Sequence, residues 1–157
     1  LYKNPAEVGA DRIVNSVAAF EKYGGPLIIV DFGTATTFDA FSKKGEYLGG
    51  AIFPGVQLSL EALFKNAAKL PRVEMAEPDN VIGKSTIESI HSGTIYGFMS
   101  MIDGMVLKIQ EELQEKAQVI ATGGIVDLIA SKSKSINTID PFLTLEGLRI
   151  IHQRNQG

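Results

Sequence analysis

An acidic residue follows a run of apolar residues and stands just before a glycine turn rich in threonine. The run covers residues 27–30, the acid is Asp31, and the turn begins at Gly33. A strand that ends in a tight glycine turn exposes unpaired backbone amides that attract anions, and the charge of Asp31 could hold a cation against phosphate oxygens. The hydroxyl donors that follow are Thr34, Thr36 and Thr37. Phosphate chemistry uses such an arrangement, although a buried strand ending in a locally hydrogen-bonded turn also fits.

A second group of candidate residues precedes this strand. Asp11 and Arg12 follow Gly9 at the start of an expected helix. The N-terminus of a helix with an adjacent arginine binds anions, and a carboxylate there can accept a proton from a substrate hydroxyl. Aspartate is also a favoured N-cap residue, so capping of the helix is the simpler explanation for Asp11 on its own.

The spacing of apolar residues predicts the elements that would position these groups. A helical stripe over residues 9–23 ends at Gly24-Gly25-Pro26, which is a typical helix stop. Three strands follow, and the turn at residues 42–45 joins the second to the third as a hairpin. The three strands are predicted at residues 27–32, 36–41 and 46–53.

The second half of the chain is predicted to be mainly helical. A helix follows Pro54-Gly55, and residues 69–84 have no clear period and are predicted to form a loop, with at most a short strand. Ser85 and Glu88 form a capping box that opens a long helix over residues 86–115. The predicted core side of this helix consists of Ile87, Ile90, Ile95, Phe98, Ile102, Met105, Ile109 and Leu113. The remaining predicted elements are a strand over residues 119–124 and helices over residues 126–132 and 143–152.

Two glycines, Gly93 and Gly97, lie four residues apart on one face of the long helix. Each glycine costs about 1 kcal/mol relative to alanine in a helix interior. We therefore expect another backbone to approach this face closely. Either a helix of a second copy of the chain or a neighbouring element of the same chain would satisfy that expectation.

Composition limits the possible classes of protein. The 157 residues fit one domain, and 45% hydrophobic and 21% charged residues are ordinary for a globular protein. The net charge of −3 gives no basic surface for nucleic acid, and the lack of cysteine excludes disulfides and thiolate chemistry. No apolar segment approaches the roughly 18 residues that cross a membrane, and the charged N-terminal residues do not resemble a signal peptide. We expect a cytoplasmic location and no membrane or nucleic-acid partner.

The order helix, three strands, helices, strand, helix predicts an α/β protein with a mixed sheet flanked by helices. An apolar strand that ends in Asp-x-Gly-Thr and leads into a meander is similar to one half of an actin-like (ribonuclease H-like) ATPase or sugar-kinase fold. That superfamily places two such halves on either side of a nucleotide cleft. The chain corresponds to one half, so we interpret residues 1–157 as a single domain.

Taken together, the motifs resemble one family closely, the type III pantothenate kinases, also known as Bvg accessory factor-like proteins. The matching motifs occur in the family's order over nearly the whole chain: Gly9-Ala-Asp-Arg12, Asp31-Phe-Gly-Thr-Ala-Thr-Thr37, Gly49-Gly50 with Pro54-Gly55, Thr86 before Ser89-Ile90 with Gly93, Thr122-Gly-Gly124, and Asp140-Pro-Phe-Leu-Thr-Leu-Glu-Gly-Leu148. The resemblance identifies the chain as the C-terminal half of such a protein. The N-terminal half, with the family's first phosphate loop, is absent from the 157 residues.

The resemblance implies a role for each candidate residue. Asp11 is similar to the general base that takes the proton from the primary hydroxyl of pantothenate. Asp31 is similar to the ligand of a monovalent cation, K+ or NH4+, beside the phosphates of ATP, which binds with Mg2+. The implied pantothenate contacts are Tyr2, Gly9, Ala10, Arg12 and Thr86, and the implied ATP contacts are Gly33, Thr34, Gly123 and Gly124.

The resemblance implies that ATP and pantothenate react to give ADP and 4′-phosphopantothenate, the first step of coenzyme A biosynthesis. It also implies a homodimer, which agrees with the glycine face of the long helix. The C-terminal half could be inactive without the N-terminal half. Two alternatives stay open: a non-catalytic accessory-factor-like transcriptional regulator that acts by protein contacts, and a different actin-like kinase or phosphatase.

Overall fold

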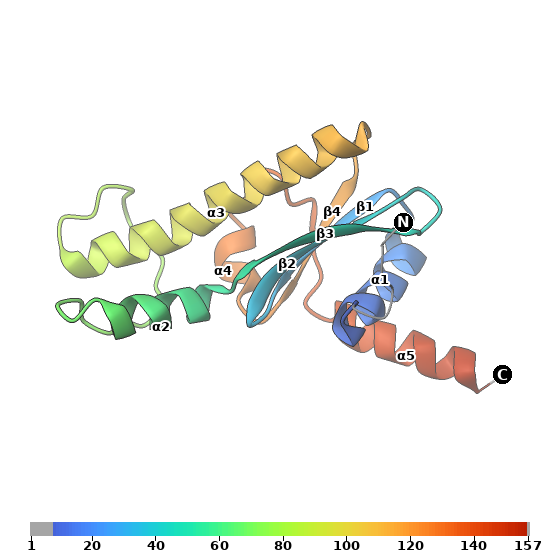
Figure 1. The fold of residues 1–157 in the computed structure, drawn as a ribbon, viewed down its shortest axis with the longest axis horizontal. Helices are drawn as coiled ribbons and strands as arrows, with labels where there is room; N and C mark the ends of the chain where they lie inside the picture. Colours follow the sequence, from blue (N-terminus) through green and yellow to red (C-terminus); the bar gives the residue numbers. More distant parts are fainter. Residues whose placement is uncertain (1–7, 157) are drawn as a thin grey trace.

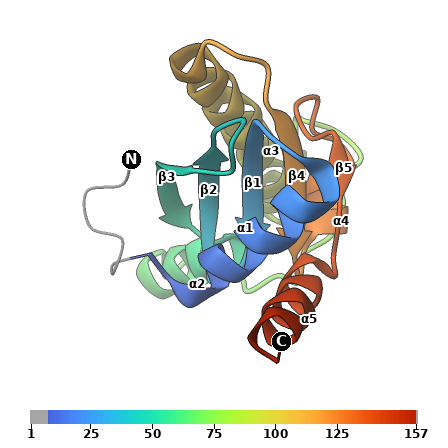
Figure 2. The same ribbon diagram turned by 90° about the vertical axis from the view of Figure 1, so that its right-hand side faces the viewer.

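A computed structural model describes residues 8–156, which form three layers with a five-stranded sheet in the middle (Figures 1 and 2). The strand order is β3-β2-β1-β4-β5. The strands are β1 (Leu27–Phe32), β2 (Ala35–Phe41), β3 (Tyr47–Pro54), β4 (Gln118–Gly123) and β5 (Thr138–Ile139). The pairings β1–β2 and β2–β3 are antiparallel, whereas β1–β4 and β4–β5 are parallel. The predicted fold class, a mixed sheet flanked by helices, is confirmed.

Two groups of helices cover the two faces of the sheet. Helices α1 (Ala10–Tyr23) and α5 (Leu143–Asn155) pack against each other on one face. Helices α2 (Val56–Asn66), α3 (Thr86–Leu113) and α4 (Val126–Ala130) lie on the other face. Within residues 8–156, no helix is both long and apolar enough to cross a membrane.

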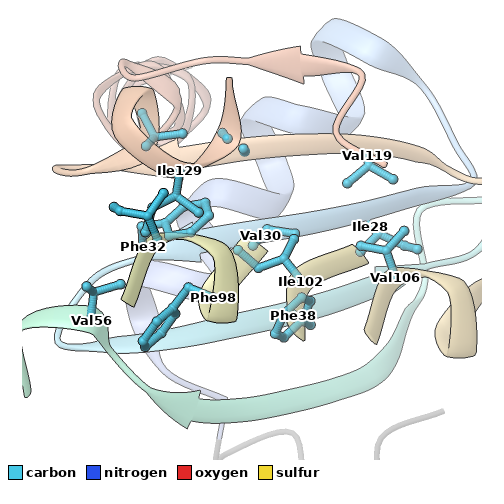
Figure 3. Close-up of a cluster of buried hydrophobic side chains, with 14 of the residues drawn as sticks. Ile28, Val30, Phe32, Phe38, Val56, Phe98, Ile102, Val106, Val119 and Ile129 are labelled. Carbon is cyan, nitrogen blue, oxygen red and sulfur yellow. The ribbon is translucent and has the colours of Figure 1, made fainter. Parts of the chain in front are cut away.

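Strand β1 supplies the core of both layers, because successive side chains of a strand point to opposite faces. Leu27 and Ile29 join the cluster under α1 and α5. Ile28, Val30 and Phe32 join the cluster under α2, α3 and α4, which Figure 3 shows in close-up. All five of these β1 side chains are at most 3% exposed. Asp31 is therefore the next residue on the α1 face, one residue before the last position of the strand.

The predicted boundaries agree with the structure to within one residue for α1 and for β1, β2 and β3. The capping box at the start of α3 is also confirmed, since the Ser85 hydroxyl accepts a hydrogen bond from the Glu88 amide at 3.2 Å. The Glu88 carboxylate accepts its reciprocal bond from the amide of Lys84. Helix α4 is two residues shorter than predicted, α5 extends three residues further, and no strand forms over residues 69–84. The two-residue β5 was not predicted.

Two predictions about α3 need correction. Ile87 was assigned to the core side, but it is 48% exposed because it lies in the first turn, beyond the edge of the sheet. Gly93 and Gly97 have no internal neighbour, since a β-carbon built on either would have nothing within 4 Å among the described residues. The interpretation that an element of the same chain packs closely on this glycine face is therefore wrong. The alternative, a second copy of the chain, stays a prediction.

Candidate active site

Asp31 lies in the centre of a polar row that crosses three strands. Its register partner on β2 is Thr37, and its register partner on β4 is Thr122. Paired residues in register point to the same face of a sheet, so all three side chains lie on the α1 side. The row stands where β1 and β4, which are parallel, both reach their carboxyl ends. In open α/β sheets this edge is where ligands bind.

The carboxylate of Asp31 is half-buried and holds one side-chain hydrogen bond. Asn15 of α1 donates from Nδ2 to Oδ2 of Asp31 at 2.9 Å. Burial raises the pKa of Asp31 above its ordinary value, the bond from Asn15 lowers it, and the negative charges of Asp11 and Asp39 raise it further. The net shift is upward. An acid with a perturbed pKa beside other acids is a feature of functional sites.

Asp11 lies in the first turn of α1, is exposed, and is close enough for its charge to raise the pKa of Asp31. The first turn of α1, which carries Asp11, therefore lies close to Asp31, in agreement with the bond from Asn15 of the same helix to Asp31. The alternative that Asp11 caps the helix is wrong, because Gly9 is the N-cap residue and no side chain caps this end. A β-carbon at Gly9 would lie 2.5 Å from Oδ1 of Asp11, so glycine is needed for the carboxylate to take this position.

Arg12 makes a part-buried cluster with two residues of the hairpin. Its Nε donates to Asp39 Oδ1 at 2.7 Å, and its Nη2 contacts the Tyr47 hydroxyl at 2.6 Å. The Tyr47 hydroxyl and the Thr37 hydroxyl also donate to Asp39. Asp39 is 2% exposed, and a buried carboxylate requires such pairing. The predicted substrate contact Arg12 thus fixes the first turn of α1 to strand β2, beside Asp31.

The turn after β1 lies at the same end of the sheet and is supported by the start of α2. Gly33 and Thr34 are exposed, and the amide of Gly55 donates to the Thr34 carbonyl at 3.0 Å. A β-carbon at Gly55 would clash with the carbonyl oxygens of Gly33 and Thr34, which explains the glycine after Pro54. One expectation is wrong here: the Gly33 amide is not unpaired, because it donates to the Ala35 carbonyl at 3.1 Å.

The three threonines of the motif do not act together. Thr34 is exposed in the turn, and Thr37 lies beside Asp31. Thr36 points to the opposite face of the sheet and is fully buried, with no hydrogen-bond partner for its hydroxyl within residues 8–156. Successive side chains of a strand point to opposite faces, so the alternation that places Thr37 at the site turns Thr36 away from it. The prediction that all three hydroxyls serve one site is therefore wrong.

Gly123 and Gly124 end strand β4 next to the end of β1. Gly123 has a φ of 110° and is in register with Phe32, whose backbone lies 2.6 Å from where a β-carbon would be. Only glycine fits there. Gly124 is exposed and has open space around it. Both predicted ATP contacts therefore lie at the same sheet edge as Gly33 and Thr34.

The remaining predicted contacts are placed differently. Ala10 is exposed at the first position of α1, and Tyr2 lies outside the described residues. Thr86 lines a groove of about 470 Å³ between α2 and α3, with Gly93 and Phe98 among the other lining residues. The first turn of α3 and helix α1 lie at opposite sides of Figure 1. Within one chain, the structure does not bring Thr86 to Asp11 and Asp31.

Three polar residues at the site were missed by the sequence reasoning. They are Asn15, Asp39 and Thr144, and the Thr144 hydroxyl donates to Asn15 Oδ1 at 2.7 Å. Two of them carry a signal in the sequence. Asn15 interrupts the apolar stripe of α1, and Asp39 occupies an inward position of an apolar strand. A polar residue at a core position needs a partner, and here the partners belong to the site.

The donor atoms near Asp31 suit a hard cation, which prefers oxygen ligands. Oδ1 of Asp31 makes no hydrogen bond to another residue in the part of the chain that the structure describes, and it lies on the side of Gly33. The guanidinium of Arg12 pairs with Asp39, whereas the charges of Asp11 and Asp39 both act on Asp31, so the three acids give the region an excess of negative charge. Residues 8–156 contain no cluster of three or more His, Cys, Asp or Glu side chains that could hold a metal ion.

The layers and the polar row define an α/β protein with a mixed sheet and a candidate site at the carboxyl ends of two parallel strands. The family model described as type III pantothenate kinase matches residues 1–108 of the chain. That match covers more than half of the sequence, and the chain therefore belongs to the type III pantothenate kinase family.

Curated relatives and a solved structure agree with this assignment. A type III pantothenate kinase of Myxococcus xanthus is 59% identical over 99% of this chain and 60% of its own length. One of Moorella thermoacetica is 56% identical over 98% of this chain and 61% of its own length. The chain thus spans about three fifths of the relatives that it matches. A solved structure from Campylobacter jejuni, described as a conserved Baf family protein and proposed transcriptional activator, shows the same fold. Its TM-score is 0.67 at 22% identity, and the match covers 99% of this chain and 69% of that one.

Proposed function

We propose that the protein containing this chain phosphorylates pantothenate with ATP, giving 4′-phosphopantothenate and ADP. The convergence of Asp11 and Asp31 at one sheet edge, in a chain of this family, carries the proposal. Relatives that bear the name pantothenate kinase at 56–59% identity support it. A cytoplasmic location, and the lack of a membrane or nucleic-acid partner, stay predictions from the sequence.

The proposed mechanism gives each acid a separate task. Asp11, exposed at the start of α1, takes the proton from the primary hydroxyl of pantothenate. Asp31, whose Oδ1 lies on the Gly33 side, would hold a monovalent cation, and Mg2+ would bind with the nucleotide. These ions would neutralise charge on the transferring phosphoryl group. Phosphoryl transfer depends mainly on positioning and on charge neutralisation. Gly33, Thr34, Gly123 and Gly124 would contact ATP, because they surround the end of the same two strands.

The test is ADP release by the full-length protein in the presence of ATP, Mg2+, K+ and pantothenate. We expect turnover with pantothenate and none with acetate or a sugar. Asp11→Asn should lower kcat by about 10²-fold or more, the usual contribution of a general base. Asp127→Asn is the matched control, since Asp127 is an exposed acid in the first turn of α4, and it should leave kcat unchanged.

Other outcomes of this assay would contradict the proposal. A folded protein without turnover would favour the regulatory protein, and turnover with a different acceptor would favour another actin-like kinase. The likeness to the Baf family structure at 22% identity shows the fold alone and does not favour the regulator.

The proposal includes a homodimer in which α3 of a second copy packs on the Gly93 and Gly97 face. Open space at both glycines and the exposed Ile87 on the same helix support it. Gly97→Leu should weaken this dimer, since leucine would separate the two helices. Light scattering of the full-length protein should then show a lower mass. An unchanged mass for Gly97→Leu would exclude this interface.

A further inference from the structure

A buried amide joins three elements directly behind Asp31. Asn15 of α1 is 2% exposed. Its Nδ2 donates to Oδ2 of Asp31 on β1 at 2.9 Å, and its Oδ1 accepts from the hydroxyl of Thr144 on α5 at 2.7 Å. The three residues are distant in sequence, so this chain of hydrogen bonds exists only when both helices are packed on the sheet.

The chemistry of the three groups fixes the direction of both bonds. An ionised carboxylate can only accept hydrogen bonds, so the amide must turn its NH2 group toward Asp31. The carbonyl oxygen of Asn15 then faces Thr144, whose hydroxyl must donate. Without that donor, the carbonyl oxygen of Asn15 would be buried with no donor from α5, which is costly, and the amide would shift to find another partner. Thr144 therefore fixes the position from which Asn15 holds Asp31.

The crossing of the two helices places Thr144 within reach of Asn15. Gly147, one turn after Thr144, packs on the backbone of Val14, and a β-carbon there would clash with the Val14 carbonyl oxygen. Gly147 is buried, and so is the neighbouring Val14. This close approach brings the two helix backbones together at the point where the Thr144 and Asn15 side chains meet.

We propose that Asn15, oriented by Thr144, is a positioning residue that holds Oδ2 of Asp31 and thereby directs Oδ1 toward the Gly33–Thr34 turn. A β-carbon at Gly33 would lie 3.9 Å from Oδ1, so this oxygen does face the turn. The inference rests on the proposed function, in which the cation and the nucleotide phosphates lie on that side. Asn15 and Thr144 would act through Asp31 without touching substrate.

The experiment compares Thr144→Val with Thr144→Ser in the full-length protein. Valine has the shape of threonine but cannot donate, whereas serine keeps the hydroxyl. We expect Thr144→Val to lower kcat by about 10-fold to 100-fold, the range seen when a partner of a functional ligand is removed, with KM for pantothenate unchanged. Thr144→Ser should restore kcat. Asn15→Leu, which removes the amide itself, should resemble Thr144→Val.

A second readout does not depend on turnover. The rise in Tm on replacing Na+ by K+ should be present in the wild type and in Thr144→Ser, and should be lost in Thr144→Val. Tyr23→Phe is the matched control, because Tyr23 makes a similar polar bond from α1 to Asp140, next to α5, without contact to Asp31. It should lower Tm but keep both kcat and the K+ effect.

These measurements separate the inference from the proposed function. If the wild type turns over pantothenate and Thr144→Val behaves like Tyr23→Phe, the inference is wrong and the function stands. If the wild type shows no turnover, the function is wrong, and the K+ effect on Tm still decides whether Thr144 positions Asp31. A wild type whose Tm does not respond to K+ would also overturn the inference.

Discussion

The two ends of helix α1 each contact an aspartate of another segment, and the two carboxylates have opposite surroundings. At the C-terminal end, Asp140 is 5% exposed and accepts hydrogen bonds from Lys22 at 2.7 Å and from Tyr23 at 2.8 Å. Burial acts to raise its pKa, but these bonds outweigh burial and hold the pKa below its ordinary value. At the N-terminal end, Asp31 has one amide donor and two acidic neighbours, and its pKa is raised.

The contrast separates a structural acid from a functional one. A carboxylate surrounded by donors stabilises the fold, because its charged form is better solvated by the protein than its neutral form. A carboxylate that is half-buried beside other acids costs stability when it is charged. A fold that keeps such a group does so at sites where the charge is used. The same residue type thus holds α1 in place at one end and is available for chemistry at the other.

The largest expected effect comes from neutralising the acid at the N-terminal end. Asp31→Asn should lower kcat of the full-length protein by about 10²-fold or more, the scale of losing one electrostatic group that acts in the transition state. The same change should raise the free energy of unfolding at pH 7, because it removes the cost of burying a charge and the repulsion with Asp11 and Asp39. Steady-state kinetics and urea unfolding measure both quantities. Nearly normal turnover, or lower stability, would contradict the comparison.

The same substitution at the other end should have the opposite result. Asp140→Asn should lower the free energy of unfolding by about 1.5–3 kcal/mol, since hydrogen bonds to charged groups contribute this much. It should leave kcat within a factor of about three, because the Asp140 side chain bonds to Lys22, Tyr23 and Phe142, and none of these is a predicted site residue. Urea unfolding monitored by circular dichroism gives the first quantity and the ADP-release assay gives the second. A large loss of turnover here would show that Asp140 also belongs to the site.

Local pattern was sufficient to predict most of this architecture. The apolar run before Asp31, the glycine and proline stops, and the capping box at Ser85 depend on neighbours within four residues, and they gave correct elements. The position of Asp31 at the end of β1 was predicted for the same reason. Burial of Ile87 was predicted wrongly, because helical spacing does not tell where the helix extends past the sheet.

Contacts between distant segments were not predictable from pattern. Asn15 and Thr144 are 129 residues apart, and Arg12 and Asp39 are 27 apart. Their meeting depends on how α1 crosses α5 and on which strand lies beside β1. The parallel pairing of β1 with β4 has the same origin, and it is this pairing that brings the Gly123 turn to the candidate site. The residues of the site were visible in the sequence, whereas the groups that orient them were not.

The smallest expected effect is on the pH dependence of the free energy of unfolding. It is also the most direct comparison of the two acids. The folded-state pKa of Asp31 is raised, so its contribution to stability is fully present below the unfolded value near 3.8 and is lost as pH rises through the folded value. The folded-state pKa of Asp140 is lowered, so its contribution is present above 3.8 and is lost as pH falls through the folded value. Ionisation of Asp31 therefore lowers the free energy of unfolding as pH rises, whereas ionisation of Asp140 raises it.

Difference curves isolate the two contributions. The free energy of unfolding of Asp31→Asn minus that of the wild type should be largest and positive near neutral pH. It should shrink as pH falls through the raised folded-state pKa and should be close to zero once pH is below about 3.8. The same difference for Asp140→Asn should be negative near neutral pH and should shrink only at still lower pH, because the wild-type carboxylate stays charged there. Urea unfolding at closely spaced pH values provides both curves. If both difference curves had the same sign, the carboxylates of Asp31 and Asp140 would have the same effect on stability. The contrast drawn between the two ends of α1 would then be wrong.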